Sequence, residues 1–153
     1  MPRIMEIYHE ARQVQISNGN LHQWAEGYPA REMVCSDIDR GVSYVLEESG
    51  SVVGVFVLAG GRDSTYASIE NGSWIDDTRD YLTIHRLAAD RHVHGVADAC
   101  FRWCWSQHHN LRVDTHEDNS IMRHCITKAG FRYCGIIHLQ NGDPRLAYQK
   151  IEI

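Results

Sequence analysis

Residues 81–101 read YLTIHRLAADRHVHGVADACF, and the pattern of this stretch changes from that of a β-strand to that of a helix, which is the main indication of the fold. Its first nine residues are β-rich, uninterrupted and too short to favour a helix, so we expect a central strand over 81–89 that ends at Asp90. From Val93 onward, apolar residues recur at the three- and four-residue spacing of a helix that buries one face. This helix should run to about His109. The chain therefore changes from strand to helix across a short junction.

Upstream of this stretch, the pattern predicts two helices and a hairpin. Apolar spacings of three and four from Ile4 to Val14 predict a first helix that ends near residues 18–20. The segment AREMVCSDIDRG, residues 30–41, predicts a second short helix that Gly41 stops. Two β-rich runs then flank residues 48–51, which is typical of a β-hairpin.

Downstream, LRVDTH (111–116) predicts a short strand, and Asn119 is a candidate N-cap for a helix that ends just before Gly130. The runs FRYCGIIHLQ (131–140) and RLAYQKIEI (145–153) predict a final pair of strands. Helices and strands in this order indicate a mixed sheet covered by helices on both faces. We expect the α+β class, as an α/β/α three-layer sandwich, in a single domain over 1–153.

Composition excludes several classes of partner. The formal net charge is -5 and Lys and Arg are not clustered, which argues against a nucleic-acid partner. No apolar run approaches the roughly 20 residues that span a bilayer, so we expect a cytoplasmic protein with no membrane partner. The five cysteines are odd in number and without paired short spacing, which favours free thiols.

The ten histidines raise the question of a metal site. None has the zinc-finger or HExxH spacing that places ligands around one ion, and we expect no metal. Cys100, Cys104 and His108 lie on one helix stripe, which two buried thiols and a surface histidine explain. A histidine-rich, metal-dependent hydrolase remains a rival hypothesis that a metal assay would test.

The junction after the central strand has the features of an anion site. The first amides of a helix have no intrahelical acceptor and carry the positive end of the helix dipole, so they can hold a phosphate. Gly95 and Ala97 are small, which lets an anion approach the backbone. The structural alternative is that both residues are small because the helix packs tightly on the sheet.

The run His92-Val93-His94-Gly95-Val96-Ala97 resembles the pyrophosphate motif Q/R-x-x-G-x-G/A of the GNAT N-acetyltransferases. Asn119, the helix after it and Gly130-Phe131 also resemble that family's pattern, and the phrases QW, GYP, IHR, DTH and YCGII resemble one bacterial branch of it. The resemblance implies the GNAT acyl-CoA N-acyltransferase fold with a mixed, mostly antiparallel sheet. Family members start with an edge strand before the first helix, whereas here Met1 is followed almost at once by the helix, so we expect this strand to be absent. The alternative is a misassigned start codon. We expect a second chain, as in a homodimer, or the C-terminus to cover the exposed edge.

The cofactor that the resemblance implies is acetyl-CoA. Its pyrophosphate would lie on the amides from Val93 to Asp98, its pantetheine arm along the strand end, and Asn119 nearby. The residues implied for cofactor binding are Leu87, Ala88, Ala89, His92, Val93, His94, Gly95, Val96, Ala97, Asp98 and Asn119. Two of them depart from the motif, since His92 replaces Gln or Arg and His94 stands where Lys or Arg is common.

The resemblance also points to catalytic groups. Many family members have a tyrosine general acid where this chain has Ile126. Either another group donates the proton, with His116, Tyr133 and Cys134 as the candidates, or the CoA thiolate leaves without help from the protein. An amine acceptor needs a base, and His85 in the IHR phrase is the first candidate because imidazole titrates near neutrality. His116 is the second. The structural alternatives are that His85 only bonds within the sheet and that His116 with Asp114 braces the loop.

Aromatic and amide side chains in two loops suggest an acceptor pocket. The candidates for substrate binding are Gln23, Trp24, Tyr28 and Trp74, with Tyr66 and Tyr81 beside them. These rings could equally pin the loops to the core. Taken together, the resemblance implies direct acetyl transfer from acetyl-CoA to the amine of a small molecule in a ternary complex. The alternative is a non-catalytic acyl-CoA binding or sensing module.

Overall fold

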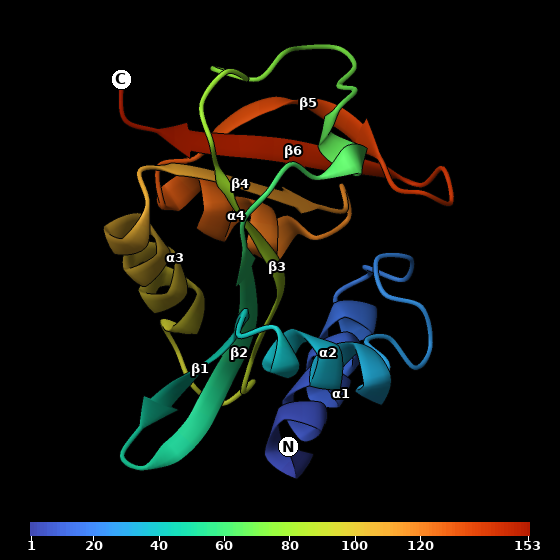
Figure 1. Ribbon diagram of the computed structural model, residues 1–153. Helices are drawn as coiled ribbons and strands as arrows, with labels where there is room; N and C mark the ends of the chain where they lie inside the picture. The colour runs from blue at the N-terminus through green and yellow to red at the C-terminus, as the bar shows by residue number, and fades with distance from the viewer.

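The computed structural model describes the whole chain, Met1–Ile153, as one sheet with helices on both faces (Figure 1). In chain order, the elements are α1 (Pro2–Ser17), α2 (Arg31–Asp39), β1 (Ser43–Glu48), β2 (Ser51–Ala59), the 3-10 turn η1 (Ser64–Tyr66), β3 (Leu82–Ala89), α3 (Val96–Gln107), β4 (Asn110–Thr115), α4 (Ser120–Lys128), β5 (Arg132–His138) and β6 (Pro144–Ile151). None of the helices is both long and apolar enough to cross a bilayer.

The strands lie in the order β1-β2-β3-β4-β6-β5. Only β3 and β4 are parallel, and every other neighbouring pair is antiparallel, as expected for this mixed sheet. β1 forms one edge of the sheet, and the C-terminal strand β6 lies between β4 and β5 toward the opposite edge. The expectation that the C-terminus covers the β1 edge is therefore wrong, because β6 pairs on both of its sides with other strands.

The helices cover the two faces of the sheet. On one face α1 and α2 bury Ile7 and Val34 against Val55 of β2. On the other face Phe101 of α3 and Ile126 of α4 belong to the largest hydrophobic core. Burying such side chains contributes roughly 1.5–3 kcal/mol each, so each face holds its helices by apolar packing. The predicted α+β, three-layer sandwich is confirmed.

Local signals set the ends of several elements. Ser49 and Gly50 both have positive φ, at 53° and 82°, which joins β1 to β2 in a tight hairpin. The side chain of Asn119 caps α4 by accepting from the amide of Met122 at 3.0 Å. These two features lie where the sequence predicts them.

The long segment between β2 and β3 folds over one end of the sheet. Its aromatic residues Tyr66, Trp74 and Tyr81 form a separate buried cluster with β5 and β6. The Trp74 indole donates to the carbonyl of Tyr66 at 3.0 Å, and Arg112 of β4 lies fully buried between Trp74 and Tyr81. This segment therefore covers the β4–β6 part of the face that carries α1 and α2.

Candidate functional site

β3 and β4 diverge after a short stretch of parallel pairing. Only Leu82 with Leu111 and Thr83 with Arg112 form pairs, and Figure 1 shows the two strands separating beyond them. From Ile84 onward, the backbone groups on the β4 side of β3 have no strand partner. Unpaired backbone groups of a strand bind extended chains through main-chain hydrogen bonds. The opening between the strands therefore has free backbone donors and acceptors with which an extended ligand that carries amides could form hydrogen bonds.

A β-bulge shapes the β3 side of this opening. Arg86 and Leu87 together oppose Phe56 of β2, and Arg86 has a φ of 50°. Leu87 packs with the α3–α4 core, as Ile84 does, whereas His85 and Arg86 between them face the opposite side. The bulge thus turns two consecutive polar side chains toward the same side of the sheet.

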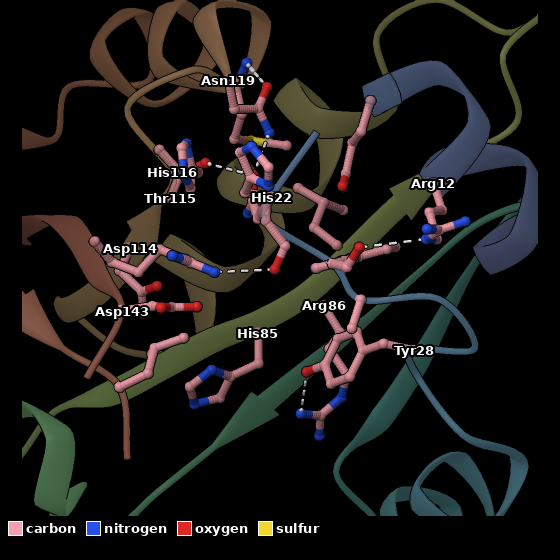
Figure 2. Close-up of a pocket in the computed structure, with 18 of the residues that line it drawn as sticks. Arg12, His22, Tyr28, His85, Arg86, Asp114, Thr115, His116, Asn119 and Asp143 are labelled. Atoms are coloured by element: carbon pink, nitrogen blue, oxygen red, sulfur yellow. Dashed lines mark hydrogen bonds between the residues drawn. The ribbon is translucent and has the colours of Figure 1, made fainter. Parts of the chain in front are cut away.

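A cavity of about 790 Å³ lies at the opening, beneath the loop that joins α1 to α2 (Figure 2). Several residues expected from the sequence line it, namely Gln23, Trp24, Tyr28, His85, Leu87, His116 and Asn119. The charged residues Arg12, Asp63, Asp114 and Arg145 also line it, and of these the sequence indicates only Asp114, as part of a loop brace. They come from four separate segments, so only the pairing of the strands brings them together.

Gln23 fastens the loop to the wall of the cavity. Its side-chain oxygen accepts hydrogen bonds from Asn119 at 2.9 Å and from Asn20 at 2.8 Å. The carbonyl of Gln23 accepts from Arg145 of β6 at 2.9 Å. Asn119, expected near the cofactor, therefore lies at the cavity with its oxygen used for the helix cap and its nitrogen used for Gln23.

His85 occupies the floor of the cavity beside two carboxylates. Its side chain is 28% exposed, and its Nε2 lies 3.6 Å from Oδ2 of Asp63. Burial lowers the pKa of His85, and the negative charges of Asp114 and Asp63 offset this only in part. The imidazole is therefore neutral near pH 7 and able to accept a proton, which is what a general base requires.

Asp114 faces His85 across the opening. Thr83 and Arg112 are the last pair between β3 and β4, and His85 and Asp114 each lie two residues further along, on the same face as that pair. Tyr66 donates its hydroxyl to Oδ2 of Asp114 at 2.6 Å. Burial raises the pKa of Asp114, against the opposing effect of that hydrogen bond.

His116 also lies at the cavity, but its ring holds the loop before α4. Its Nδ1 accepts from the amide of Asp118 at 3.0 Å, and its carbonyl accepts from the amide of Asn119 at 3.0 Å. An imidazole that accepts at Nδ1 carries its proton on Nε2 when neutral. This arrangement favours the bracing role for His116 over that of a base.

The junction between β3 and α3 presents a row of free amides. The amides of residues 94–98 donate to no protein acceptor, and Gly95 at the N-cap has a φ of 83°. By contrast, the amide of His92 donates to the Asp90 carboxylate at 2.8 Å and that of Val93 to the Asp90 carbonyl at 3.1 Å. The expected helix start at Val93 is wrong, because Asp90 holds this turn and α3 begins at Val96. The amides that can bind an anion start at His94.

The requirement for glycine at Gly95 is conformational. A Cβ built there would meet nothing within 4 Å, but the positive φ disfavours other residues. Close packing occurs instead at Gly54 of β2, where a Cβ would lie 2.5 Å from Cγ1 of Val96. Tight packing of the helix on the sheet therefore explains why residue 54 is glycine. Residue 95 is glycine because the row of free amides requires a positive φ there.

Other sequence candidates lie outside the cavity lining. Trp74, expected to bind substrate, is buried in the aromatic cluster with Tyr66 and Tyr81, so those rings hold the covering segment in place. Among the candidate proton donors, Tyr133 is half exposed on β5 and Cys134 is buried, and neither lines the cavity. No group of three or more His, Cys, Asp or Glu side chains is arranged around a common metal position.

No protein-family model matches the sequence, and no curated protein is significantly similar to it. Among solved structures, a GNAT-family acetyltransferase from Streptococcus agalactiae is 34% identical over 99% of this chain and 90% of its own, with a TM-score of 0.90. A GNAT-family acetyltransferase from Listeria monocytogenes is 18% identical over 97% and 87% of the two chains, with a TM-score of 0.68. A Bacillus subtilis acetyltransferase in complex with CoA is 17% identical over 82% and 86%, with a TM-score of 0.56. The last two share the fold, whereas the similarity to the Streptococcus protein extends to the sequence. The chain therefore belongs to the GNAT family of acetyltransferases.

Proposed function

We propose that the protein transfers the acetyl group of acetyl-CoA to the amine of a small molecule, by direct attack in a ternary complex. The observation that carries this proposal is the opening between β3 and β4, which provides unpaired strand backbone beside the free amides of residues 94–98. The first suits the amide-containing pantetheine arm and the second suits a pyrophosphate. The Bacillus subtilis relative with bound CoA has the same fold.

The residues at the junction fit a phosphate-bearing ligand. The helix dipole of α3 adds partial positive charge to the free amides, and the side chains of His92 and His94 are exposed beside them. Asp98 in the first turn is negative, but it forms an ion pair with Arg102 at 2.9 Å. Leu87 and Asn119 would contact the pantetheine arm from the cavity side, and Ala88 and Ala89 would contribute backbone.

The acceptor amine would lie between His85 and Asp114. An alkyl amine with a pKa near 10.4 is almost fully protonated at pH 7 and needs to lose a proton before it can attack. The carboxylates near His85 attract the ammonium form, and the neutral imidazole takes one proton from it. The free amine then attacks the thioester carbonyl, so that an N–C bond forms and the C–S bond breaks. As the C–S bond breaks, the acetylated nitrogen loses its second proton to solvent, and the departing thiolate takes up a proton from solvent. His85 then releases its own proton to solvent, so the products are the N-acetyl compound and the CoA thiol.

One observation favours the alternative of a non-catalytic acyl-CoA binding module. Ile126, at the family's tyrosine position, is fully buried in the α3–α4 core and provides no proton for the departing thiolate. A thiol with a pKa of about 8.5 is a tolerable leaving group near neutral pH without such help. Catalysis is therefore compatible with Ile126, and turnover is the measurement that separates the two functions.

The test combines binding with turnover. Titration calorimetry should detect binding of acetyl-CoA, and a panel of primary amines should release CoA thiol with an N-acetyl product of the expected mass. Binding without acetylation of any amine would leave the binding module as the function. Absence of acetyl-CoA binding would overturn both proposals.

A further inference from the structure

The cavity contains a buried cation that has no carboxylate partner. Arg145 of β6 is only 4% exposed, lines the cavity and forms no ion pair. Its Nη1 donates to the carbonyl of Pro144 and its Nη2 to that of Gln23, each at 2.9 Å, while its Nε donates to no protein atom. Neutral carbonyls only partly compensate a buried charge, so an anion in the cavity would find an incompletely satisfied guanidinium.

The same cavity contains a carboxylate that has no cation partner. Asp114 of β4 accepts a hydrogen bond from Tyr66 but forms no ion pair. Its strand partner on β6 is Ala147, and Arg145 lies two residues from Ala147. Asp114 and Arg145 are therefore diagonal neighbours on one face of the sheet, with backbone positions roughly 7 Å apart. The cavity thus presents two opposite charges that attract each other at longer range but form no ion pair.

The other charged residues at the cavity are engaged or peripheral, and Glu26 is exposed in the loop between α1 and α2. Arg86 is paired with Asp37, and the Asp63 carboxylate accepts from the amide and hydroxyl of Thr65. Asp143 is exposed near Arg145 without an ion pair to it. Arg12 lines the cavity and donates to the carbonyl of Trp24 at 3.3 Å, on the far side from Asp114 in Figure 2.

From this arrangement, and resting on the proposed acetyl transfer, we propose that the acceptor is a small zwitterion that carries both an amine and a carboxylate. Its carboxylate binds the guanidinium of Arg145, and its amine lies at Asp114 and His85. A ligand of this kind supplies an ion-pair partner to the buried Arg145 and to the partly buried Asp114. Arg145 is then the residue that selects acceptors of the amino-acid type over simple amines.

The experiment compares matched acceptors. Each amino acid is assayed beside its carboxamide and its decarboxylated amine, with acetyl-CoA saturating. The carboxylate compounds should have kcat/KM roughly 10- to 100-fold higher than their partners, as expected when a charged hydrogen bond is lost from a buried site. Arg145→Gln should remove most of this difference, because kcat/KM for the carboxylate compounds should fall much further than kcat/KM for the decarboxylated amines.

Controls separate recognition from structure. Arg145 also holds the Gln23 loop, so a purely structural role would lower the rates for both members of each pair equally in Arg145→Gln. Arg12→Gln removes another cation from the cavity and should keep the preference for carboxylates. Arg145→Lys, which keeps the charge, should recover part of the preference. Thermal unfolding of each variant checks that it is folded.

The outcomes distinguish this proposal from the function on which it rests. If simple amines are acetylated as efficiently as their carboxylate partners, the zwitterion proposal is overturned and the acetyltransferase stands. If acetyl-CoA binds but no compound in either set is acetylated, the proposed function is overturned, and the zwitterion proposal is overturned with it.

Discussion

Arg86 of β3 and Asp37 of α2 form a buried ion pair in which Nη2 of the arginine lies 2.8 Å from both carboxylate oxygens. Asp37 is 2% exposed, and the arginine has the positive φ of the bulge next to His85. A non-glycine residue with positive φ carries a conformational cost, so an interaction has to hold it there. The ion pair therefore connects α2 to the backbone that aims His85 into the cavity.

Removing the carboxylate should destabilise the fold. Asp37→Asn leaves Arg86 buried without a counterion, and we expect a loss of about 3 kcal/mol in the free energy of unfolding. Asp39 is an exposed acidic residue of the same helix that forms no ion pair, so Asp39→Asn should lower the free energy of unfolding by less than about 0.5 kcal/mol. Urea denaturation at pH 7.5 measures both. Equal costs for the two variants would contradict the structural role of the ion pair.

The row of free amides depends on the conformation of Gly95. Gly95→Ala meets no steric obstacle but forces alanine into positive φ at a cost of about 1 kcal/mol, so the turn should rearrange and acetyl-CoA should bind several-fold more weakly. Gly50→Ala is the matched control, because Gly50 has a φ of 82° in the distant β1–β2 hairpin and equally open surroundings. It should lose similar stability and keep its affinity in calorimetry. Unchanged affinity in Gly95→Ala would contradict the proposed cradle.

The lowered pKa of His85 sets the pH dependence of turnover. Since burial disfavours the protonated imidazole, His85 stays a base below the ordinary histidine pKa of about 6.5. The acid limb of kcat/KM should therefore have its midpoint below that pH, and His85→Gln should lower the rate and remove the limb. His138→Gln, on β5 outside the cavity, should keep the wild-type profile. A midpoint above pH 6.5, or full activity in His85→Gln, would exclude His85 as the base.

The lowered pKa of His85 also makes the free energy of unfolding depend on pH. The unfolded chain binds a proton at His85 at a higher pH than the folded chain does, so stability falls as the pH falls through about 6.5. His85→Gln should reduce this dependence.

Arg112 marks the point where β3 and β4 separate. Its guanidinium lies 4.0 Å from the ring centroid of Trp74 and 3.8 Å from that of Tyr81, and Nη2 lies 2.8 Å from Asp77. Arg112→Lys keeps the charge but loses the planar stacking, so we expect about 2 kcal/mol of destabilisation. Arg132→Lys, at an exposed position on β5, should be neutral in the same denaturation experiment. A neutral Arg112→Lys would show that the stack contributes little.

Features that depend on residues close together in the chain can be predicted from the sequence. The hairpin at Ser49 and Gly50, the cap at Asn119 and the strand-to-helix change after Asp90 each depend on local backbone preference or short-range hydrogen bonding. The predicted start of α3 is wrong because Val93 continues the apolar spacing, whereas the carboxylate and carbonyl of Asp90 accept from the amides of His92 and Val93 in a turn. The hydrogen bond to the Asp90 side chain thus stabilises a turn at residues where the apolar periodicity predicts a helix.

Periodicity and backbone conformation are enough to predict the layered α+β architecture, the glycine at the helix start and the position of His85 on the central strand. The set of charges that shares the cavity depends instead on contacts between residues far apart in the chain. Asp114 and Arg145 are 31 positions apart in the chain and become neighbours on one face of the sheet because β4 pairs with β6. Trp74 is buried because its ring packs against Tyr66 and Arg112. Both arrangements result from long-range strand pairing and burial, and neither of these produces a periodic pattern in the sequence.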